Sequence, residues 1–317
     1  MKYLITGSCG FIGYSTCKDL LNKGFKVVGI DNLNNYYDSS LKISRKRDLE
    51  KYKNFYFLEA DLENISELKI PNIDIVIHLA AQAGVRGGPN LIDGYIKDNI
   101  TCFLEILNFT VAREIKFFIF ASSSSVYSDI NTVPFLEDDK KYKPQTVYGL
   151  TKRLNENIAH IYAKKYALNA LGLRFFTVYG DFGRPDMAYY NFTERILNKE
   201  TIILNNKGNI YRDMTHIDDI VNGINLSVRH IANQNKNFFD VFNLGSGKPI
   251  RIKDLLDILV KEVGYDTTKI KHKSVEEVLK THASLVKSKK ILGYEPKKEF
   301  NVAIKQFCVW LKEHKNI

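Results

Sequence analysis

The first half of the chain alternates short apolar runs with longer stretches of helical periodicity. Continuous apolar runs are typical of strands that are buried on both faces of a sheet. They lie at residues 3–6, 26–30, 54–59, 73–78, 116–121 and 171–175. Between them, apolar residues recur with helical spacing at 11–23, 41–52, 91–113 and 148–166. This alternation predicts an α/β fold in which helices cover a parallel sheet.

A different pattern begins after Gly180. The elements expected there are a helix near Tyr189, a short apolar run at 201–204, a charged strand at 211–215, a helix at 217–230, a strand at 241–244 and helices at 252–263 and 302–314. We expect the strand at 241–244 to return to the main sheet. A second, smaller lobe is therefore predicted to be interleaved with the first.

The chain opens with a strand, three glycines and a helix. Gly7, Gly10 and Gly13 are spaced GxxGxxG, close to the GxGxxG of dinucleotide-binding loops. Glycine permits the tight turn and lets a pyrophosphate lie against the helix N-terminus, whose N–H groups favour an anion. Asp31 ends the second strand, where a carboxylate accepts from ribose hydroxyls and repels a 2′-phosphate. The motif predicts NAD rather than NADP, on a Rossmann-type, doubly wound parallel sheet.

A second group of candidate residues follows the fifth strand. Tyr148 and Lys152 are one helical turn apart, so both project from the same face of a helix. An adjacent ammonium and a cationic nicotinamide both favour the phenolate, which can take a proton from a sugar hydroxyl while hydride leaves the carbon. Four serines, Ser122 to Ser125, can supply a hydroxyl that passes the proton to Tyr148. A solvated surface pair has the same spacing, but the position near the carboxyl edge of the sheet favours catalysis.

Composition narrows the class of protein. The 317 residues are 44% hydrophobic and 26% charged, which excludes a disordered or fibrous chain. The net charge of +10 suits nucleic acid or an anionic metabolite; because the basic residues are dispersed, we expect no nucleic-acid partner. No apolar stretch reaches the roughly 18 residues of a membrane span, and no signal peptide is recognised. Four scattered cysteines without metal-ligand spacing predict a reducing cytoplasm and no metal.

These residues together resemble the extended short-chain dehydrogenase/reductase family, and within it the nucleotide-sugar epimerases and dehydratases. Further stretches that carry the resemblance are the pair Asp61 and Leu62, HLAA at 78–81, SSSSVY at 122–127 and LRFFTVYG at 173–180. Four more are similar to UDP-glucuronate 4-epimerases, namely NLNNYYD at 32–38, AAQAGVR at 80–86, GRPDMA at 183–188 and RDMTHIDDI at 212–220. The resemblance implies NAD-dependent C4 epimerisation of a nucleotide sugar, UDP-glucuronate to UDP-galacturonate, through a 4-keto intermediate. It also implies tightly bound NAD that is regenerated each turnover, and a place in polysaccharide biosynthesis.

The resemblance also implies a role for each candidate residue. Tyr148 is the base, Lys152 its pKa modulator and Ser123 the hydroxyl on the reacting oxygen. Asp61 and Leu62 meet the adenine. The cofactor-binding residues are Gly7, Gly10, Phe11, Ile12, Gly13, Asp31, Asn32, Asp61, Leu62, Ala80, Ala81, Tyr148, Lys152 and Phe175. The substrate-binding residues are Arg86, Ser123, Ser124, Thr177, Arg184, Met187 and Arg212, the last on the diphosphate.

Other activities of the same family stay open. A dehydratase needs an acidic pair where this chain has Ser124 and Ser125, and decarboxylating relatives keep a glutamate that it lacks. A 4-dehydrogenase that releases its product, and a non-catalytic nucleic-acid-binding member, are further alternatives. Two departures from the family pattern are the residues at 87–89, which are Gly-Gly-Pro, and Ser284, where relatives carry aspartate.

The predicted division of the chain is discontinuous. Residues 1–175 and about 211–243 are expected to form the NAD-binding domain, and 176–210 with 244–317 the nucleotide-sugar-binding lobe. The resemblance further implies a homodimer that associates through the helices at 91–113 and 148–166.

Overall fold

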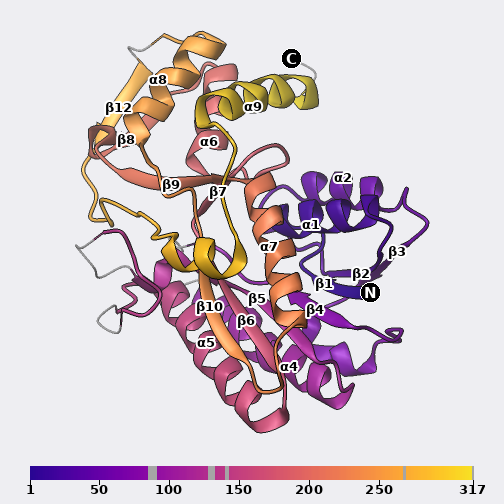
Figure 1. Cartoon of the computed structure of the whole chain (residues 1–317). Coiled ribbons are helices and arrows are strands. Elements are labelled where there is room, and N and C mark those ends of the chain that lie inside the picture. Colours follow the sequence, from indigo (N-terminus) through magenta and orange to yellow (C-terminus); the bar gives the residue numbers. More distant parts are fainter. Residues whose placement is uncertain (85–90, 128–132, 140–142, 267–268, 316–317) are drawn as a thin grey trace.

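A seven-stranded parallel sheet forms the centre of the molecule (Figure 1). The computed structural model describes residues 1–317 except 85–90, 128–132, 140–142, 267–268 and 316–317. The strands are β1 (Lys2–Thr6), β2 (Lys26–Asp31), β3 (Phe55–Glu59), β4 (Ile75–His78), β5 (Phe117–Ser123), β6 (Asn169–Phe175) and β10 (Phe239–Leu244). Their order is β10-β6-β5-β4-β1-β2-β3, and all pairs are parallel. The predicted doubly wound α/β sheet is confirmed, with its reversal of strand order between β1 and β4.

Helices cover both faces of this sheet (Figure 1). Ile5 of β1 packs into a core with α1 (Phe11–Asn22) and α7 (Ile217–Ala232), whereas its neighbour Leu4 packs with α4 (Cys102–Ala112) and α5 (Val147–Tyr166). Successive side chains of a strand point to opposite faces, so a sheet covered on both sides needs apolar residues at every position. This is why the strands are continuous apolar runs in the sequence.

The helix expected at 91–113 is interrupted. It consists of α3 (Ile92–Ile96), a π-helical turn η3 (Lys97–Thr101) and α4. The wider turn places Asn99 in the interior, where its Oδ1 accepts from the Gln82 N–H at 2.9 Å and its Nδ2 donates to Thr151 Oγ1 at 3.1 Å. The interruption thus ties the segment after β4 to α5, and π turns of this kind are frequent at functional sites.

The second region lies beyond one end of the sheet (Figure 1). Its strands are β7 (Thr177–Tyr179), β9 (Tyr211–His216) and β11 (Pro249–Arg251) in one small sheet, and β8 (Ile202–Asn205) with β12 (Ile270–Lys273) in another. Its helices are α6 (Ala188–Leu197), α8 (Ile252–Val263) and α9 (Phe300–Lys315), which share a core around Tyr189, Leu256 and Phe307. Within the stretch 211–243, β9 pairs in the small sheet, whereas α7 and β10 pack on the large one.

A further helix, α2 (Ser39–Leu49), packs next to α1. Short turns are η1 (Leu62–Glu67), η4 (Ser124–Tyr127), η5 (Asn206–Gly208) and η7 (Ser288–Leu292). Among the helices that the structure describes, none has both the length and the apolar character that crossing a bilayer requires.

Candidate active site

The carboxyl ends of the parallel strands bring many of the predicted residues to one edge of the sheet. Gly7 follows β1, Asp31 ends β2, and Asp61 comes shortly after β3. Ser123 ends β5 and is paired in register with Phe175, the last residue of β6. Ligands of open α/β sheets bind at this edge, beside the point where the strand order reverses.

The three glycines are required by close backbone contacts. A Cβ on Gly7, whose φ is +69°, would lie 2.8 Å from the Ala80 nitrogen, and one on Gly13 would lie 2.0 Å from the Gly7 oxygen. Helix α1 begins without a capping side chain, so the first N–H groups, from Phe11 on, point outward with no side-chain acceptor. This is the arrangement that binds a pyrophosphate. The Phe11 side chain itself belongs to the core, beside the partly buried Ile12.

Two carboxylates flank the glycine loop. Asp31 accepts from the backbone N–H groups of Cys9 and Leu33, each at 2.9 Å, and a carboxylate keeps further lone pairs for ribose hydroxyls. Asp61 accepts from Lys97 Nζ at 3.2 Å and is within hydrogen-bonding reach of the exposed Asn32 side chain. Burial raises the pKa of Asp61, but the hydrogen bonds and charge of Lys97 outweigh it and leave that pKa below its ordinary value. Both groups are therefore placed as acceptors.

Leu62 and Ala81 occupy different environments beside these carboxylates. The Leu62 side chain is buried in the core beneath β2 and α4. Ala81 is partly exposed and follows Ala80, whose N–H donates to Thr6 Oγ1 at 3.2 Å. The segment after β4 is thus held against the glycine loop by Thr6.

Lys152 is a buried side chain whose ammonium has no polar partner among the described residues. Its side chain is 1% exposed, and it makes no hydrogen bond or ion pair with any residue that the structure describes. Burial lowers its pKa to about 8. Burying a cation without an acceptor costs free energy. A ligand with oxygen acceptors, such as the hydroxyls of a ribose, would offset that cost. Together with the uncapped helix and Asp31, this donor set fits a dinucleotide of the NAD type.

Tyr148 lies beside Ser123 and Arg184. Its phenol is within hydrogen-bonding reach of the Ser123 hydroxyl, which also accepts from the Ser125 N–H at 3.1 Å. Burial raises the pKa of Tyr148, and the charge of Arg184 and the Ser123 hydrogen bond oppose part of that rise. Lys152 Nζ lies 5.8 Å from the centre of the Tyr148 ring, and in the chain by itself desolvation prevails.

The predicted sugar-binding residues are distributed over several elements. Arg184 pairs with Asp186 at 2.5 Å, and its guanidinium carbon lies 5.8 Å from the centre of the Tyr36 ring. Arg212 of β9 pairs with Glu277 at 2.9 Å. The others are Ser124, partly exposed in η4; Thr177, the first residue of β7; Met187, whose side chain packs on the core of α6 and α8; and Arg86, which lies outside the described residues.

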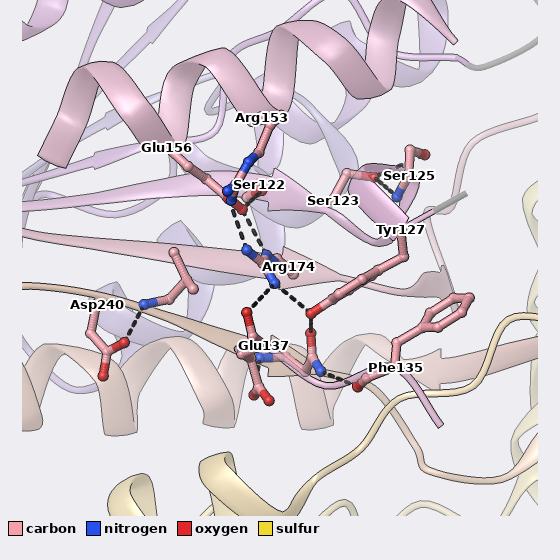
Figure 2. A network of polar contacts seen from close by, with 12 residues as sticks. Ser122, Ser123, Ser125, Tyr127, Phe135, Glu137, Arg153, Glu156, Arg174 and Asp240 are labelled. Carbon is pink, nitrogen blue, oxygen red and sulfur yellow. Dashed lines mark hydrogen bonds and ion pairs between the residues drawn. The ribbon is translucent and has the colours of Figure 1, made fainter. Parts of the chain in front are cut away.

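A buried ionic network supports the catalytic elements, and it was not predicted from the sequence. Glu156 of α5 accepts from Arg174 Nε and from Ser122 Oγ, both at 2.7 Å. Arg174 of β6 also donates to the Tyr127 hydroxyl at 2.6 Å, and this hydroxyl donates to Asn243 of β10 at 2.7 Å (Figure 2). Glu156 is one turn beyond Lys152 on the same helix face, and this spacing is the signal that could have revealed it.

Comparisons with known proteins agree with this geometry. The model of the NAD dependent epimerase/dehydratase family matches residues 3–245. The chain is 42% identical to the uncharacterized protein MJ1055 of Methanocaldococcus jannaschii, with 100% of this chain and 98% of that protein covered. It is 37% identical to the UDP-glucuronate 4-epimerase of Thermodesulfobacterium geofontis, with 98% and 96% covered.

A solved structure extends the likeness to the whole fold. The UDP-glucuronic acid 4-epimerase of Bacillus cereus, in complex with UDP-glucuronic acid and NAD, matches with a TM-score of 0.87 and 30% identity, over 99% of this chain and 100% of that one. Since the family model covers most of the chain, the chain belongs to the NAD-dependent epimerase/dehydratase family.

Proposed function

We propose that this protein interconverts UDP-glucuronate and UDP-galacturonate by NAD-dependent epimerisation at C4. The observation that carries the proposal is the contact between Tyr148 and Ser123 beside the buried Lys152, whose ammonium has no hydrogen-bond acceptor in the described part of the chain. The relatives named for this activity match the chain over nearly its full length and support the choice of substrate.

The residues divide the chemistry between them. When bound, NAD would supply the hydride acceptor and donor that allow C4 to lose hydride from one face and regain it on the other. The Tyr148 phenolate takes the proton of the C4 hydroxyl as the 4-keto sugar forms, and returns it to the same oxygen at the end. Ser123 hydrogen-bonds to that oxygen, and Lys152 supplies positive charge that favours the phenolate. After one cycle the protein, NAD and the proton are as they began, and only the configuration at C4 differs.

The two negative ends of the substrate are assigned to arginines. Guanidinium groups bind carboxylate and phosphate through paired N–H donors. Because the charge of Arg184 acts on Tyr148, we assign Arg184 to the uronate carboxylate, together with Thr177 and Arg86. Arg212 is assigned to the diphosphate; it would exchange all or part of its pairing with Glu277 for that ligand.

We further propose a homodimer that forms through α5 and α3. Helix α5 exposes a line of apolar side chains, and α3 adds two more; these are Val147, Leu150, Leu154 and Ile161 on α5, and Ile92 and Ile96 on α3. Exposed apolar patches of this kind mark association surfaces. The four cysteines are buried free thiols, which suits a reducing cytoplasm, and the activated sugar product suits polysaccharide synthesis.

The test is proton NMR of the purified protein with UDP-glucuronate and no added NAD. Epimerisation predicts galacto-configured H1 and H4 signals that grow to a fixed ratio. Release of carbon dioxide with UDP-xylose would instead identify a decarboxylase, and stoichiometric NADH with a free 4-keto sugar would identify a dehydrogenase. If the spectrum stays unchanged after NAD is added, a panel of UDP-, GDP- and CDP-sugars decides whether another sugar nucleotide is the substrate.

A further inference from the structure

Arg45 is a buried cation on the helix predicted at 41–52. Lys42 is 6% exposed and Arg45 is fully buried, because both residues lie on the inner face of α2. Arg45 falls between Leu41 and Leu49, one turn from the first and one turn from the second, so it occupies the apolar stripe of the helix.

The guanidinium of Arg45 joins two loops that are far apart in the sequence. Its Nη1 donates to the Cys9 carbonyl at 2.8 Å, inside the glycine loop, and to the Tyr37 hydroxyl at 2.7 Å. Its Nη2 donates to the carbonyls of Phe182 at 2.5 Å and Gly183 at 3.2 Å. The two terminal nitrogens of one planar group therefore hold two loops. Nη1 holds the glycine loop, and Nη2 holds the residues just before Arg184.

This arrangement is not explained by stability alone. Arg45 makes no ion pair with any described residue, and its Nε is buried without an acceptor in the described part of the chain. Burying a cation among neutral acceptors is costly, and an unsatisfied buried donor adds to the cost. An anion bound at the glycine loop, such as the diphosphate of NAD, would offset that cost because it brings negative charge to the side of the loop that Arg45 holds.

Contacts around the loop at 180–184 fix the position of its last residue, Arg184. A Cβ on Gly183 would lie 1.6 Å from the Tyr189 hydroxyl, and that hydroxyl donates to the Gly180 carbonyl at 3.2 Å. Phe182 has a φ of +57° and packs its ring 5.0 Å from that of Tyr14 on α1. The loop is thus confined on both sides. Arg184 directly follows Phe182 and Gly183, whose carbonyls accept from Arg45.

We infer that Arg45 is a positioning residue. It couples the binding of NAD at the glycine loop to the position of the loop at 180–184, which carries the sugar-binding candidate Arg184. Bound NAD favours the buried guanidinium, and the guanidinium holds the Phe182 and Gly183 carbonyls so that Arg184 faces Tyr148. The part that concerns the sugar rests on the proposed function; the coupling between the two loops does not.

The test is hydrogen exchange by mass spectrometry, with and without saturating NAD. In the unchanged protein, NAD is expected to slow exchange about tenfold or more in peptides over 7–14 and also over 180–190. In Arg45→Met, saturating NAD still protects 7–14, but the protection at 180–190 is lost. Arg47→Met, a change of an exposed neighbour on the same helix, is the matched control and should behave as the unchanged protein.

A second variant keeps the test decisive if Arg45→Met does not fold. Arg45→Lys keeps the charge, so NAD affinity is retained, but an ammonium lacks the planar fork that reaches both loops. It should therefore lose the NAD-linked protection at 180–190 and raise KM for UDP-glucuronate about tenfold. NAD-linked protection that persists in both variants, or that is absent at 180–190 in the unchanged protein, would overturn the inference. A protein that fails to epimerise UDP-glucuronate still gives a clear exchange result, so the two proposals fail separately.

Discussion

At the scale of single residues, burial and charge compete for the protonation state of the site. Burial raises the pKa of Tyr148 and lowers the pKa of Lys152 to about 8, so each group is pushed toward its neutral form. Catalysis by the phenolate needs the opposite. The positive charge of Arg184 already counters part of the shift at Tyr148, and the cationic nicotinamide supplies more when it is bound.

Replacing the phenol tests this assignment. Tyr148→Phe removes the proton acceptor but keeps the ring, so we expect kcat to fall by about 10²- to 10⁴-fold while the NAD content and Tm stay unchanged. The measurements are NMR of the sugar signals and absorbance of the nucleotide released on denaturation. Tyr166→Phe, at the exposed end of the same helix, is the control and should retain activity. Activity that survives in Tyr148→Phe would remove Tyr148 from the mechanism.

His78 makes stability depend on pH. Burial, with a smaller contribution from the Lys152 charge, lowers its pKa to about 3, whereas the unfolded chain titrates near 6.5. Between these values the unfolded state binds the extra proton, so the free energy of unfolding falls as the pH drops. We expect a loss of roughly 3 kcal/mol from this group between pH 7 and 4.5. Urea unfolding of the NAD-free protein at both pH values measures it.

The controls for His78 compare how steeply the free energy of unfolding changes with pH, rather than its value at one pH. His78→Gln should be less stable at pH 7, because Gln replaces a ring that shares a hydrogen bond with Thr6 at 2.8 Å, but its stability should fall less on acidification. His272→Gln, at an exposed position, should keep the slope of the unchanged protein. An equal slope in all three would assign the acid sensitivity to other groups.

At the scale of elements, α5 carries two candidate site residues and one supporting carboxylate on the same face. Tyr148, Lys152 and Glu156 follow one another at intervals of one turn, and the last is anchored to β5 through Ser122 and to β6 through Arg174. Figure 2 shows Glu156 of this helix beside Ser122 and Arg174. The helix is therefore held against the two strands that end at Ser123 and Phe175. The network fixes the contact between Tyr148 and Ser123 without touching the substrate.

Breaking one side of this buried ion pair should be severe. Glu156→Gln leaves the Arg174 charge uncompensated, and we expect a loss of about 3–5 kcal/mol in the free energy of unfolding. Arg174→Met should also destabilise the protein, but by less, because Glu156 keeps its ion pair with Arg153 at 2.8 Å. The double variant should lose clearly less than the sum of the two, because neither charge is then left alone. Additive losses in denaturant unfolding would contradict a coupled pair.

At the scale of the whole molecule, the two regions are interleaved rather than consecutive. After β9 in the small sheet, α7 and β10 return to the large sheet, and α8 and α9 then complete the second region (Figure 1). The chain passes between the regions several times, so the site at their junction is supported from both. Arg45 adds a side-chain link to these backbone crossings.

The proposed dimer is tested at the same scale. Leu150→Asp and Leu154→Asp place charges on the exposed apolar line of α5, so we expect sedimentation to show a monomer in place of a dimer. Val309→Asp on α9 is the matched control, since that side chain is similarly exposed but lies on another helix, and it should leave the dimer intact. A monomer in the unchanged protein would end the proposal.

Much of the fold could be predicted because it is periodic. The apolar runs identified all seven strands of the main sheet, and the helix at 252–263 has the predicted bounds. β7, β11 and β12 were missed because they are short, and β12, Ile-Lys-His-Lys, has no apolar run to detect. The π turn at Asn99 was missed because its cause, a contact with Gln82, lies in another element.

The sequence by itself determined the parallel sheet, the glycine loop and the choice of candidate residues on α5, because these depend on local periodicity and on spacings along one element. Only the tertiary structure decided the environment of each group. Burial depends on what packs from elsewhere in the chain, so the raised pKa of Tyr148, the burial of Lys152 and the buried pair of Glu156 and Arg174 follow from contacts between distant segments. For the same reason, Arg45 is a residue type that usually lies on the surface, yet the fold buries it between the glycine loop and the loop at 180–184.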